Sequence, residues 1–306
     1  MAAAGLVALA LLLQTDSTVP FASPETRALV VRAQARHVAM EREVAAYTAR
    51  YRFRGSVGGG GRAWQQMLNV WTTELDGTVR WQAPNDVQVR VDGRRTTNRF
   101  GVDPGLSVSR PWFVPRALGD SVRVFFVDYP ARAAVHPLAA GAEAWYRYAL
   151  VDSLVVTVPG SAARRLLLVE VTPRRSAPSL VAGRLWLDAG SADVARFAFR
   201  FVGTALREGM SGRDDREATE VGRFARFFQS LDVDLEYQLQ EGRLWMPYRQ
   251  VLVGLLRFTQ LGDGYGNFTA TTTFSDYEIT DGTAPPPRAA VAAAPADAPP
   301  PPAAEG

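Results

Sequence analysis

Two similar sequence words constrain the fold of this chain more than any other feature. Residues Gly183–Asp188 read Gly-Arg-Leu-Trp-Leu-Asp, and residues Gly242–Pro247 read Gly-Arg-Leu-Trp-Met-Pro. Each places a tryptophan in an apolar run that follows a Gly-Arg pair, and glycine adopts turn conformations that other residues avoid. We therefore interpret each Gly-Arg pair as a turn that opens a strand. The repetition predicts consecutive hairpins of one antiparallel sheet, with tryptophans at equivalent positions.

The middle of the chain carries the two-residue alternation that is typical of half-buried strands. The alternation is clearest in Tyr47–Phe53, where aromatic and small side chains alternate with threonine and arginine. Further strands are expected at residues 67–75, 79–82, 87–91, 122–128, 144–157, 165–172, 181–188, 194–202, 231–239, 244–258 and 267–279. Turn dipeptides such as Asp76-Gly77 and Asp92-Gly93 separate them. Short turns between successive strands predict an antiparallel meander.

One helix is expected before the first strand. Ser23 and Pro24 form a good helix start, because serine caps a helix N-terminus and proline suits its first turn. Apolar residues then recur at steps of three and four, with one histidine among them: Leu29, Val30, Ala33, His37, Met40, Val44 and Tyr47. A single amphipathic helix before many strands excludes an alternating α/β fold. We predict a mainly β (α+β) fold whose sheet is covered by this helix.

Two long connections interrupt the expected meander. Residues 96–120 hold several prolines around Trp112-Phe113, and we expect an ordered loop that its aromatic side chains fix in place. Residues 203–229 begin with a charged stretch and continue with phenylalanines, which predicts a short amphipathic helix after a charged lead. Loops of this length are usually either functional or disordered. Both interpretations of residues 203–229 stay open.

The two ends differ from the middle of the chain. Residues 2–13 form an apolar or small run, too short for the roughly 20 residues that cross a bilayer but suited to a signal peptide. We expect residues 1–22 to be a signal peptide and residues 283–306, rich in proline and alanine, to be a disordered tail. Residues 23–282 then form a single domain. Cysteine is absent, so we expect neither a disulfide nor a lipidated cysteine.

The charge pattern argues against a nucleic-acid partner. All 34 basic residues are arginine, and 31 acidic residues are interleaved with them along the chain. A protein that binds nucleic acid would concentrate its positive charge on one face or stripe. We therefore expect no nucleic acid among the partners.

The sequence carries no strong signature of catalysis or of a cofactor. It has no metalloprotease motif, no nucleophile elbow and no phosphate-binding loop. His37 lies on the inner face of the expected helix and is interpreted as a core residue. His136 lies in a turn, where a capping role or solvent exposure is expected. A hydrolase would need His136 near a carboxylate and a nucleophile such as Ser109 or Ser211, and we expect no enzyme and no cofactor.

Three carboxylates, Asp232, Asp234 and Glu236, fall on one face of an expected strand. A row of this kind could hold a hard cation. The same alternation is also the ordinary mark of a solvent-facing strand, whose carboxylates pair with arginines on neighbouring strands. We favour the ion-paired face and expect no metal site.

The apolar residues exceed what one helix can cover. Val251–Leu256 is apolar on both faces, and such a strand needs cover on both sides. Phe199 lies in a phenylalanine-rich strand, and Trp186 and Trp245 lie on nearby strands. Two interpretations follow: an ordinary filled core, and a cavity for an apolar ligand.

The order of these segments resembles the LolA/LolB-like periplasmic lipoprotein-carrier family. The resemblance rests on the helix, on Tyr47–Phe53, on Gly183–Asp188 and on the strand that begins at Val194 and carries a basic residue. The words Gly242–Tyr248 and Phe274–Ile279 are similar to the equivalent sheet domain of proteins associated with the outer membrane. The resemblance implies a curved antiparallel meander, an unclosed β-barrel covered by the N-terminal helix. It also implies an apolar groove for acyl chains or lipidated partners, and no catalytic residues.

Together these observations predict an exported, non-enzymatic protein of the bacterial cell envelope, either periplasmic or secreted. We expect it to bind a lipid or acylated ligand in the apolar concave face of the half-barrel, through Trp186, Phe199, Trp245 and Leu252. Expected partners are a lipid or lipidated protein and an outer-membrane partner, with the chain itself a monomer. The alternative is an interaction module with a filled core, which contacts partners through residues 203–229 or the proline-rich tail.

Overall fold

The computed structural model of the chain describes residues 19–60, 68–84, 86–99, 108, 110–115, 121–122, 134–157, 162–175, 180–202, 228–258 and 264–282. Residues 1–18 of the expected signal peptide, residues 203–227 of the long connection and the tail 283–306 lie outside the described residues. So do residues 123–128 of one expected strand.

The described residues form one α-helix, one short 3-10 helix and twelve strands. The helices are α1 (Pro24–Glu43) and η1 (Ala142–Ala144). The strands are β1 (Val44–Gly60), β2 (Leu68–Gln82), β3 (Asp86–Asn98), β4 (Ser121–Val122), β5 (Ala134–Val135), β6 (Tyr146–Val156), β7 (Arg164–Pro173), β8 (Val181–Asp188), β9 (Val194–Phe201), β10 (Phe228–Gln240), β11 (Leu244–Phe258) and β12 (Gly264–Asp281).

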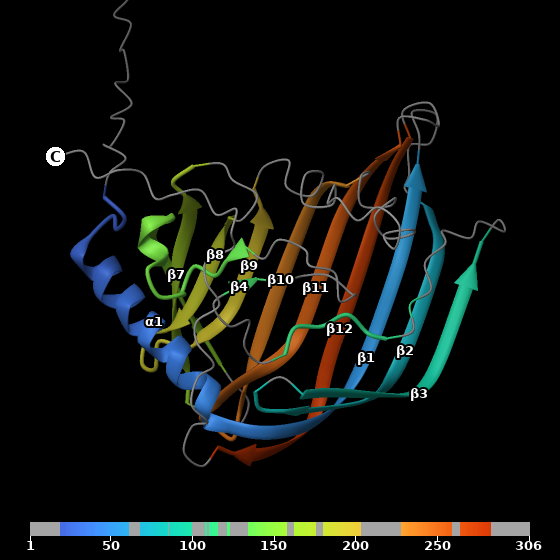
Figure 1. Cartoon of the computed structure of the whole chain (residues 1–306), viewed down its shortest axis with the longest axis horizontal. Coiled ribbons are helices and arrows are strands. Elements are labelled where there is room, and N and C mark those ends of the chain that lie inside the picture. The colour runs from blue at the N-terminus through green and yellow to red at the C-terminus, as the bar shows by residue number, and fades with distance from the viewer. Residues whose placement is uncertain are drawn as a thin grey trace, which may run out of the picture.

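Ten strands form one antiparallel sheet in the order β3-β2-β1-β12-β11-β10-β9-β8-β7-β6. The sheet curves around its concave side but does not close, because β3 and β6 remain at its two edges (Figure 1). Strands β4 and β5 form a separate pair. The prediction of a mainly β, unclosed half-barrel with an N-terminal helix is confirmed.

The sheet consists of two meanders that one strand pair joins. Strands β6 to β12 each pair with the next strand in sequence, and so do β1 to β3. The first strand then pairs antiparallel with the last, from Val44 opposite Asp281 to Gly60 opposite Tyr265. Both ends of the domain are therefore fixed in the centre of the sheet.

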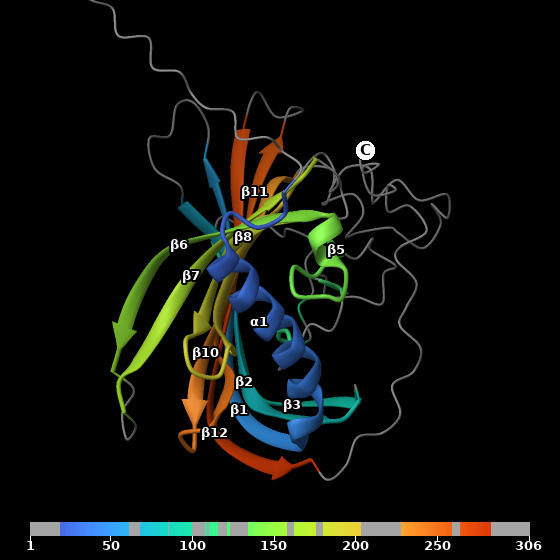
Figure 2. The same ribbon diagram turned by 90° about the vertical axis from the view of Figure 1, so that its left-hand side faces the viewer.

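Helix α1 begins as its sequence predicts. The Ser23 hydroxyl accepts a hydrogen bond from the Thr26 backbone N–H at 3.1 Å, which satisfies one of the free donors of the first turn. Leu29, Val30 and Ala33 are buried against the sheet. The helix crosses the end of the sheet near β6–β9 (Figure 2), where the Thr26 hydroxyl accepts a hydrogen bond from the Leu150 N–H at 3.2 Å. Among the described helices, none has both the length and the apolar character to span a lipid bilayer.

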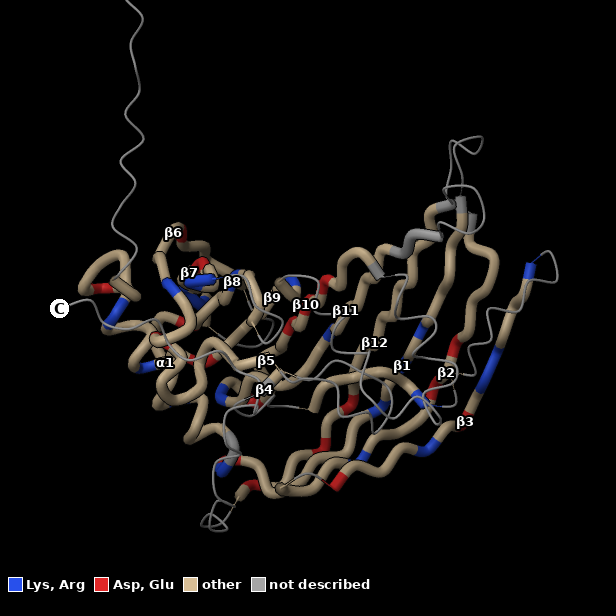
Figure 3. Tube along the Cα trace, turned by 45° about the horizontal axis from the view of Figure 1, so that its top comes forward, with Lys and Arg blue, Asp and Glu red and all other residues tan. Residues whose placement is uncertain are grey.

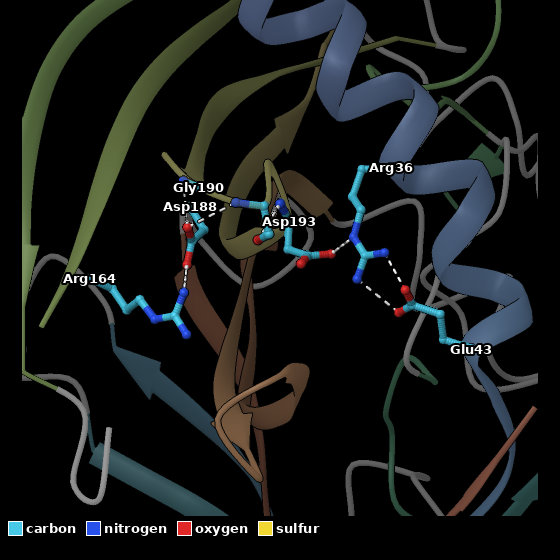
Figure 4. Close-up of polar contacts among 7 residues, drawn as sticks. Arg36, Glu43, Arg164, Asp188, Gly190 and Asp193 are labelled. Atoms are coloured by element: carbon cyan, nitrogen blue, oxygen red, sulfur yellow. Dashed lines mark hydrogen bonds and ion pairs between the residues drawn. The ribbon is translucent and has the colours of Figure 1, made fainter. Parts of the chain in front are cut away.

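Polar contacts tie α1 to the β8–β9 hairpin (Figure 4). Arg36 Nε lies 2.5 Å from Asp193 Oδ1, and the same guanidinium donates to Glu43 Oε2 at 2.8 Å. The Asp193 side chain is only 2% exposed, against 22% for Arg36. A buried carboxylate is tolerated only when it is paired or hydrogen-bonded. The position of the helix and the conformation of the hairpin therefore depend on each other.

A second carboxylate shapes the same hairpin from within. Asp188 Oδ1 accepts hydrogen bonds from the backbone N–H groups of Gly190 at 2.8 Å and Ser191 at 3.2 Å. Its other oxygen lies 3.7 Å from Arg164 at the start of β7. The final aspartate of the first sequence word thus closes a turn, as aspartate commonly does by bonding backbone N–H groups two and three residues on.

Arg36→Met tests the link between helix and hairpin. The variant leaves the Asp193 carboxylate buried without its guanidinium, so the free energy of unfolding should fall by about 3 kcal/mol. Arg200→Met is the matched control, because Arg200 pairs with Asp232 at an exposed position, where loss of an ion pair costs less than about 1 kcal/mol. Urea denaturation of both variants measures the difference. Equal losses in the two variants would contradict the proposed link.

The two sequence words have different conformations, and only one begins with a turn. Glu241 and Gly242 have φ values of 51° and 69°, and the Arg243 N–H donates to the Gln240 carbonyl at 3.0 Å, which defines the β10–β11 turn. Gly183 instead lies inside β8, so the predicted turn there is wrong. A Cβ on Gly183 would lie 2.7 Å from the Phe199 Cβ. Glycine is needed at residue 183 for close approach between strands.

The predicted turns at Asp76-Gly77 and Asp92-Gly93 are also wrong. Strands β2 and β3 continue through them, with Asp76 opposite Gly93 and Gly77 opposite Val91. Asp92 has no partner residue in this register, so the irregularity is a β-bulge that bends the β2–β3 ribbon. A local pair of turn-forming residues does not distinguish a bulge from a reversal of the chain.

Candidate functional site

The concave face of the sheet is mainly apolar from β6 to β1. Cross-strand pairing aligns one residue from each strand, so the row can be followed from edge to edge. The row runs Tyr148, Val171, Gly183, Phe199, Val233, Leu252, Ala270, Gly55, Thr73 and Thr96. Six of these residues belong to the main hydrophobic cluster of the protein: Tyr148, Val171, Phe199, Val233, Leu252 and Ala270. Small residues gather where β1 and β12 meet.

The structure brings together two of the four predicted site residues. Phe199 and Leu252 lie in the same inner row, with Val233 of β10 between them, and are 4% and 2% exposed. Both belong to the main cluster.

The other two predicted residues lie on the opposite face. Trp186 stands between Leu185 and Leu187, and Trp245 between Leu244 and Met246; all four neighbours are in the main cluster. Side chains alternate between faces along a strand, so both tryptophans point away from it. They pack in a second cluster with Leu166, Ala195 and Leu239. The guanidinium of Arg196 covers the Trp186 ring at 4.9 Å. The four residues therefore do not line one surface.

A short extended segment lies on the inner face at the centre of the sheet. Residues Arg110–Pro115 cross β11 and β12 (Figure 1), and Trp112 and Val114 are both buried. The Phe113 ring packs edge-on against Phe274, with centroids 5.7 Å apart. We call residues 110–115 the covering segment. The prediction that Trp112-Phe113 pins an ordered loop is confirmed for these residues.

Two buried polar side chains hold the covering segment. Gln250 on β11 and Thr272 on β12 are directly opposite each other, and both are 0% exposed. The Gln250 amide donates to the Val114 carbonyl at 2.7 Å and accepts from the Val114 N–H at 2.6 Å. The Thr272 hydroxyl donates to the Trp112 carbonyl. Sequence reasoning missed both residues, although each is a polar residue among apolar inner positions of its strand, Leu252 for Gln250 and Ala270 and Phe274 for Thr272.

Gln250→Leu tests this attachment. The substitution removes both hydrogen bonds to Val114 and leaves two buried backbone groups without their partner, at a cost of about 1–3 kcal/mol. The Val114 amide should then exchange with deuterium at least about tenfold faster. Gln88→Leu on the exposed β3 edge is the control and should change nothing at Val114. Unchanged exchange at Val114 in Gln250→Leu would show that the segment is held in another way.

The two histidines of the chain stack on each other in the core. The rings of His37 on α1 and His136 before Pro137 are 4.5 Å apart and nearly parallel, at 8°. His136 also meets the edge of Phe197, and its Nδ1 accepts a hydrogen bond from the Leu138 N–H at 3.0 Å. The core prediction for His37 and the capping prediction for His136 are confirmed. The nucleophiles considered with His136, Ser109 and Ser211, lie outside the described residues.

Burial sets the protonation state of this pair. Removal from water, with a smaller contribution from His37, lowers the pKa of His136 well below its ordinary value of 6.5. The folded protein therefore holds His136 neutral in a range of pH where the unfolded chain binds a proton. Between about pH 6.5 and the lower folded pKa, acid favours the unfolded chain.

The free energy of unfolding should accordingly be insensitive to His136 above about pH 6.5 and decline as pH falls below it. Guanidinium denaturation at a series of pH values from 8 to 5.5 measures the slope. In His136→Asn, the amide oxygen can still accept the Leu138 N–H, and no titrating ring remains. The slope just below pH 6.5 should be smaller in this variant, and an equal slope would exclude His136 as its source.

The outer face of β9–β11 carries the predicted carboxylate row as ion pairs. Arg196 donates to both oxygens of Asp234 at 2.8 and 2.5 Å, and Arg200 to both oxygens of Asp232 at 2.6 and 3.0 Å. Glu236 lies 3.5 Å from Arg249. Acidic and basic positions are mixed across this part of the sheet (Figure 3). These contacts fit a solvent-facing ladder of opposite charges, as predicted from the alternation.

Sequence comparison gives no relative for this chain. No model of a protein family matches the sequence. No curated protein matches it either.

Comparison of structures finds solved proteins of similar architecture. A LolA superfamily protein from Nitrosomonas europaea is 12% identical, with 84% of this chain and 94% of that chain covered and a TM-score of 0.24. An outer membrane lipoprotein-sorting protein domain from Vibrio parahaemolyticus is 10% identical, with 83% and 93% covered and a TM-score of 0.28. A chain of the Pseudomonas aeruginosa MucA/MucB complex is 16% identical, with 82% and 94% covered and a TM-score of 0.22.

Two of these structures bear the name of the family that the sequence words resemble or of its lipoprotein-sorting role. At these identities and TM-scores the comparison identifies no equivalent site residues.

Proposed function

We propose that this chain is an exported, non-enzymatic binding protein of the bacterial cell envelope, which takes a lipid or acylated ligand onto the inner face of its half-barrel. One observation carries the proposal. The apolar inner row continues through β10, β11, β12 and β1, and the described contacts over β11 and β12 come from a short extended segment.

The two halves of the inner face are covered in different ways. Near β6–β9, helix α1 is anchored by the ion pair of Arg36 with buried Asp193 and by the stacked histidines. Over β11 and β12, the covering segment is held by hydrogen bonds from Gln250 and Thr272 and by packing of its aromatic side chains. A short segment without its own secondary structure opens at lower cost than a packed helix. The inner surface beneath it is therefore the part of the core that a ligand reaches most easily.

The chemistry of this surface suits a hydrocarbon chain. Leu252 faces Ala270 across the strands, and Ala270 faces Gly55, so the surface is apolar and its side chains are small at the centre. Each methylene of an acyl chain that enters it contributes about 0.8 kcal/mol. The cost of moving the covering segment and of ordering the ligand offsets part of this gain. A long chain is therefore favoured over a short one.

The remaining features fit a binding role. The described contacts of His136 are with aromatic rings and a backbone N–H, which serve packing and capping. We propose export because of the apolar run at residues 2–13. We also propose that the protein is a monomer, as expected from the sequence. The interior surface, through Phe199 and Leu252, is the proposed binding site, and an outer-membrane or lipidated protein is the proposed partner.

Uptake of a fluorescent long-chain fatty acid by delipidated protein tests the proposal. Wild type should bind the probe saturably. Leu252→Gln places a polar amide on the inner face and should weaken binding about tenfold, because its buried amide has no designed partner. Val253→Gln changes the next residue, which is 37% exposed on the outer face, and should bind as wild type does. Circular dichroism confirms that both variants fold.

The same measurement separates the two candidate functions. The low exposure of Phe199 and Leu252, 4% and 2%, also suits an interaction module with a filled core. Such a module would take up no probe at any concentration. Its expected contact surfaces are the tail and residues 203–229, which lie almost wholly outside the described residues. Saturable uptake with equal affinity in Leu252→Gln would place the ligand away from the inner face.

A further inference from the structure

The inner face contains a polar recognition element that a hydrocarbon ligand does not need. Gln250 and Thr272 lie in a row whose other central members, Leu235 and Phe53, are apolar. Both polar residues are completely buried. Buried amides and hydroxyls are costly unless they are hydrogen-bonded. Their presence in this row calls for a partner that offers hydrogen-bonding groups at this place.

The partner in the structure is a peptide backbone. Gln250 contacts the N–H and the carbonyl of the same residue, Val114, at 2.6 and 2.7 Å. Thr272 contacts the carbonyl of Trp112, two residues earlier. One side-chain amide can satisfy both backbone groups of a residue only with its oxygen toward the N–H and its NH₂ toward the carbonyl. The pair therefore recognises the main chain of an extended peptide and not its side chains.

Side-chain contacts add a preference for sequence. Trp112 and Val114 are both 4% exposed, whereas Phe113 packs edge-on against Phe274 at 5.7 Å. Successive side chains of an extended segment alternate in direction. A strand with an aromatic residue, a second aromatic residue and an aliphatic residue thus fits the surface.

We propose that the inner face binds an extended, apolar peptide strand of a partner protein in the place that residues 112–114 occupy. Gln250 and Thr272 would form hydrogen bonds to the backbone of this strand. The covering segment is then an internal competitor for this site. The inference rests on the proposed function only in using the same face, since it names a peptide strand and requires no acyl chain. A hydrocarbon tail alone would leave the Gln250 amide and the Thr272 hydroxyl without partners.

Competition with a tethered segment predicts weak binding by wild type. A segment in the same chain acts at an effective concentration of the order of millimolar, and the apparent affinity of a free peptide falls by the fraction of molecules that are open. The double variant Trp112→Ala, Val114→Ala loosens the covering segment while leaving its backbone in place. It should therefore bind an external peptide at least about tenfold more tightly than wild type does.

The probe is a fluorescein-labelled, unacylated peptide with the sequence of residues 108–115, Val-Ser-Arg-Pro-Trp-Phe-Val-Pro. Its control is the same peptide N-methylated at the second valine. This peptide lacks the N–H that would donate a hydrogen bond to the Gln250 side-chain oxygen. The loosened full-length variant should bind the parent peptide about tenfold more tightly than the methylated one, the effect of one buried hydrogen bond. Adding Gln250→Leu should abolish this difference.

A second measurement uses wild type, in case the loosened variant folds poorly. Saturating parent peptide should increase deuterium exchange at the Val114 amide of the protein, because the peptide displaces the segment. Equal affinity for the two peptides, or unchanged exchange with peptide in excess, overturns the inference.

The fatty-acid assay distinguishes this failure from that of the proposed function. Uptake of the fatty acid without peptide binding would leave acyl binding standing and remove the peptide site. Peptide binding without fatty-acid uptake would support the peptide site and contradict acyl binding.

Discussion

The pairing of β1 with β12 is the interaction on which the rest of the structure depends. It joins two meanders, β1–β3 and β6–β12, into one sheet of ten strands. It also places Gly55 beside Ala270 and Phe53 beside Thr272, so the inner rows continue across the junction. Without this pair the concave face would end at β12. Strand β12 would then be an edge strand, and Thr272 would have a neighbouring strand on one side only. The surface proposed for ligand binding therefore depends on contact between the two ends of the domain.

The described residues cover that surface in two different ways, and the difference has a physical cause. One helix of 20 residues cannot span a sheet of this width, so it is fixed at the β6–β9 end. Buried Asp193 and the stacked histidines fix it there. The centre is covered by residues 110–115 through side-chain contacts to their backbone. Among the described residues, a half covered by an ion-paired helix and a half covered by a hydrogen-bonded segment thus share one apolar face.

Sequence reasoning predicted the local elements well, because these depend on neighbours in the chain. The helix start at Ser23, the alternation in Tyr47–Phe53 and the charge ladder around Asp234 all appear as expected. The β1–β12 pairing could not be predicted, since nothing in either strand specifies its distant partner. The side of the sheet on which each tryptophan lies could not be predicted either. Alternation determines which residues of a strand share a face, but not which face is the inner one. Trp186 and Trp245 share the outer cluster, whereas Phe199 and Leu252 lie within.

The central claim is that the covering segment leaves the inner face when a ligand binds there. The absence of cysteine allows a direct test, because spin labels can be placed at Phe113→Cys on the segment and at Val253→Cys on the outer face of β11 without removing native thiols. Pulsed dipolar spectroscopy then measures the distance between them, with and without saturating fatty acid. The account predicts one distance in the free protein and a distinct, broader distribution in the complex. An unchanged distance with the ligand demonstrably bound would contradict it.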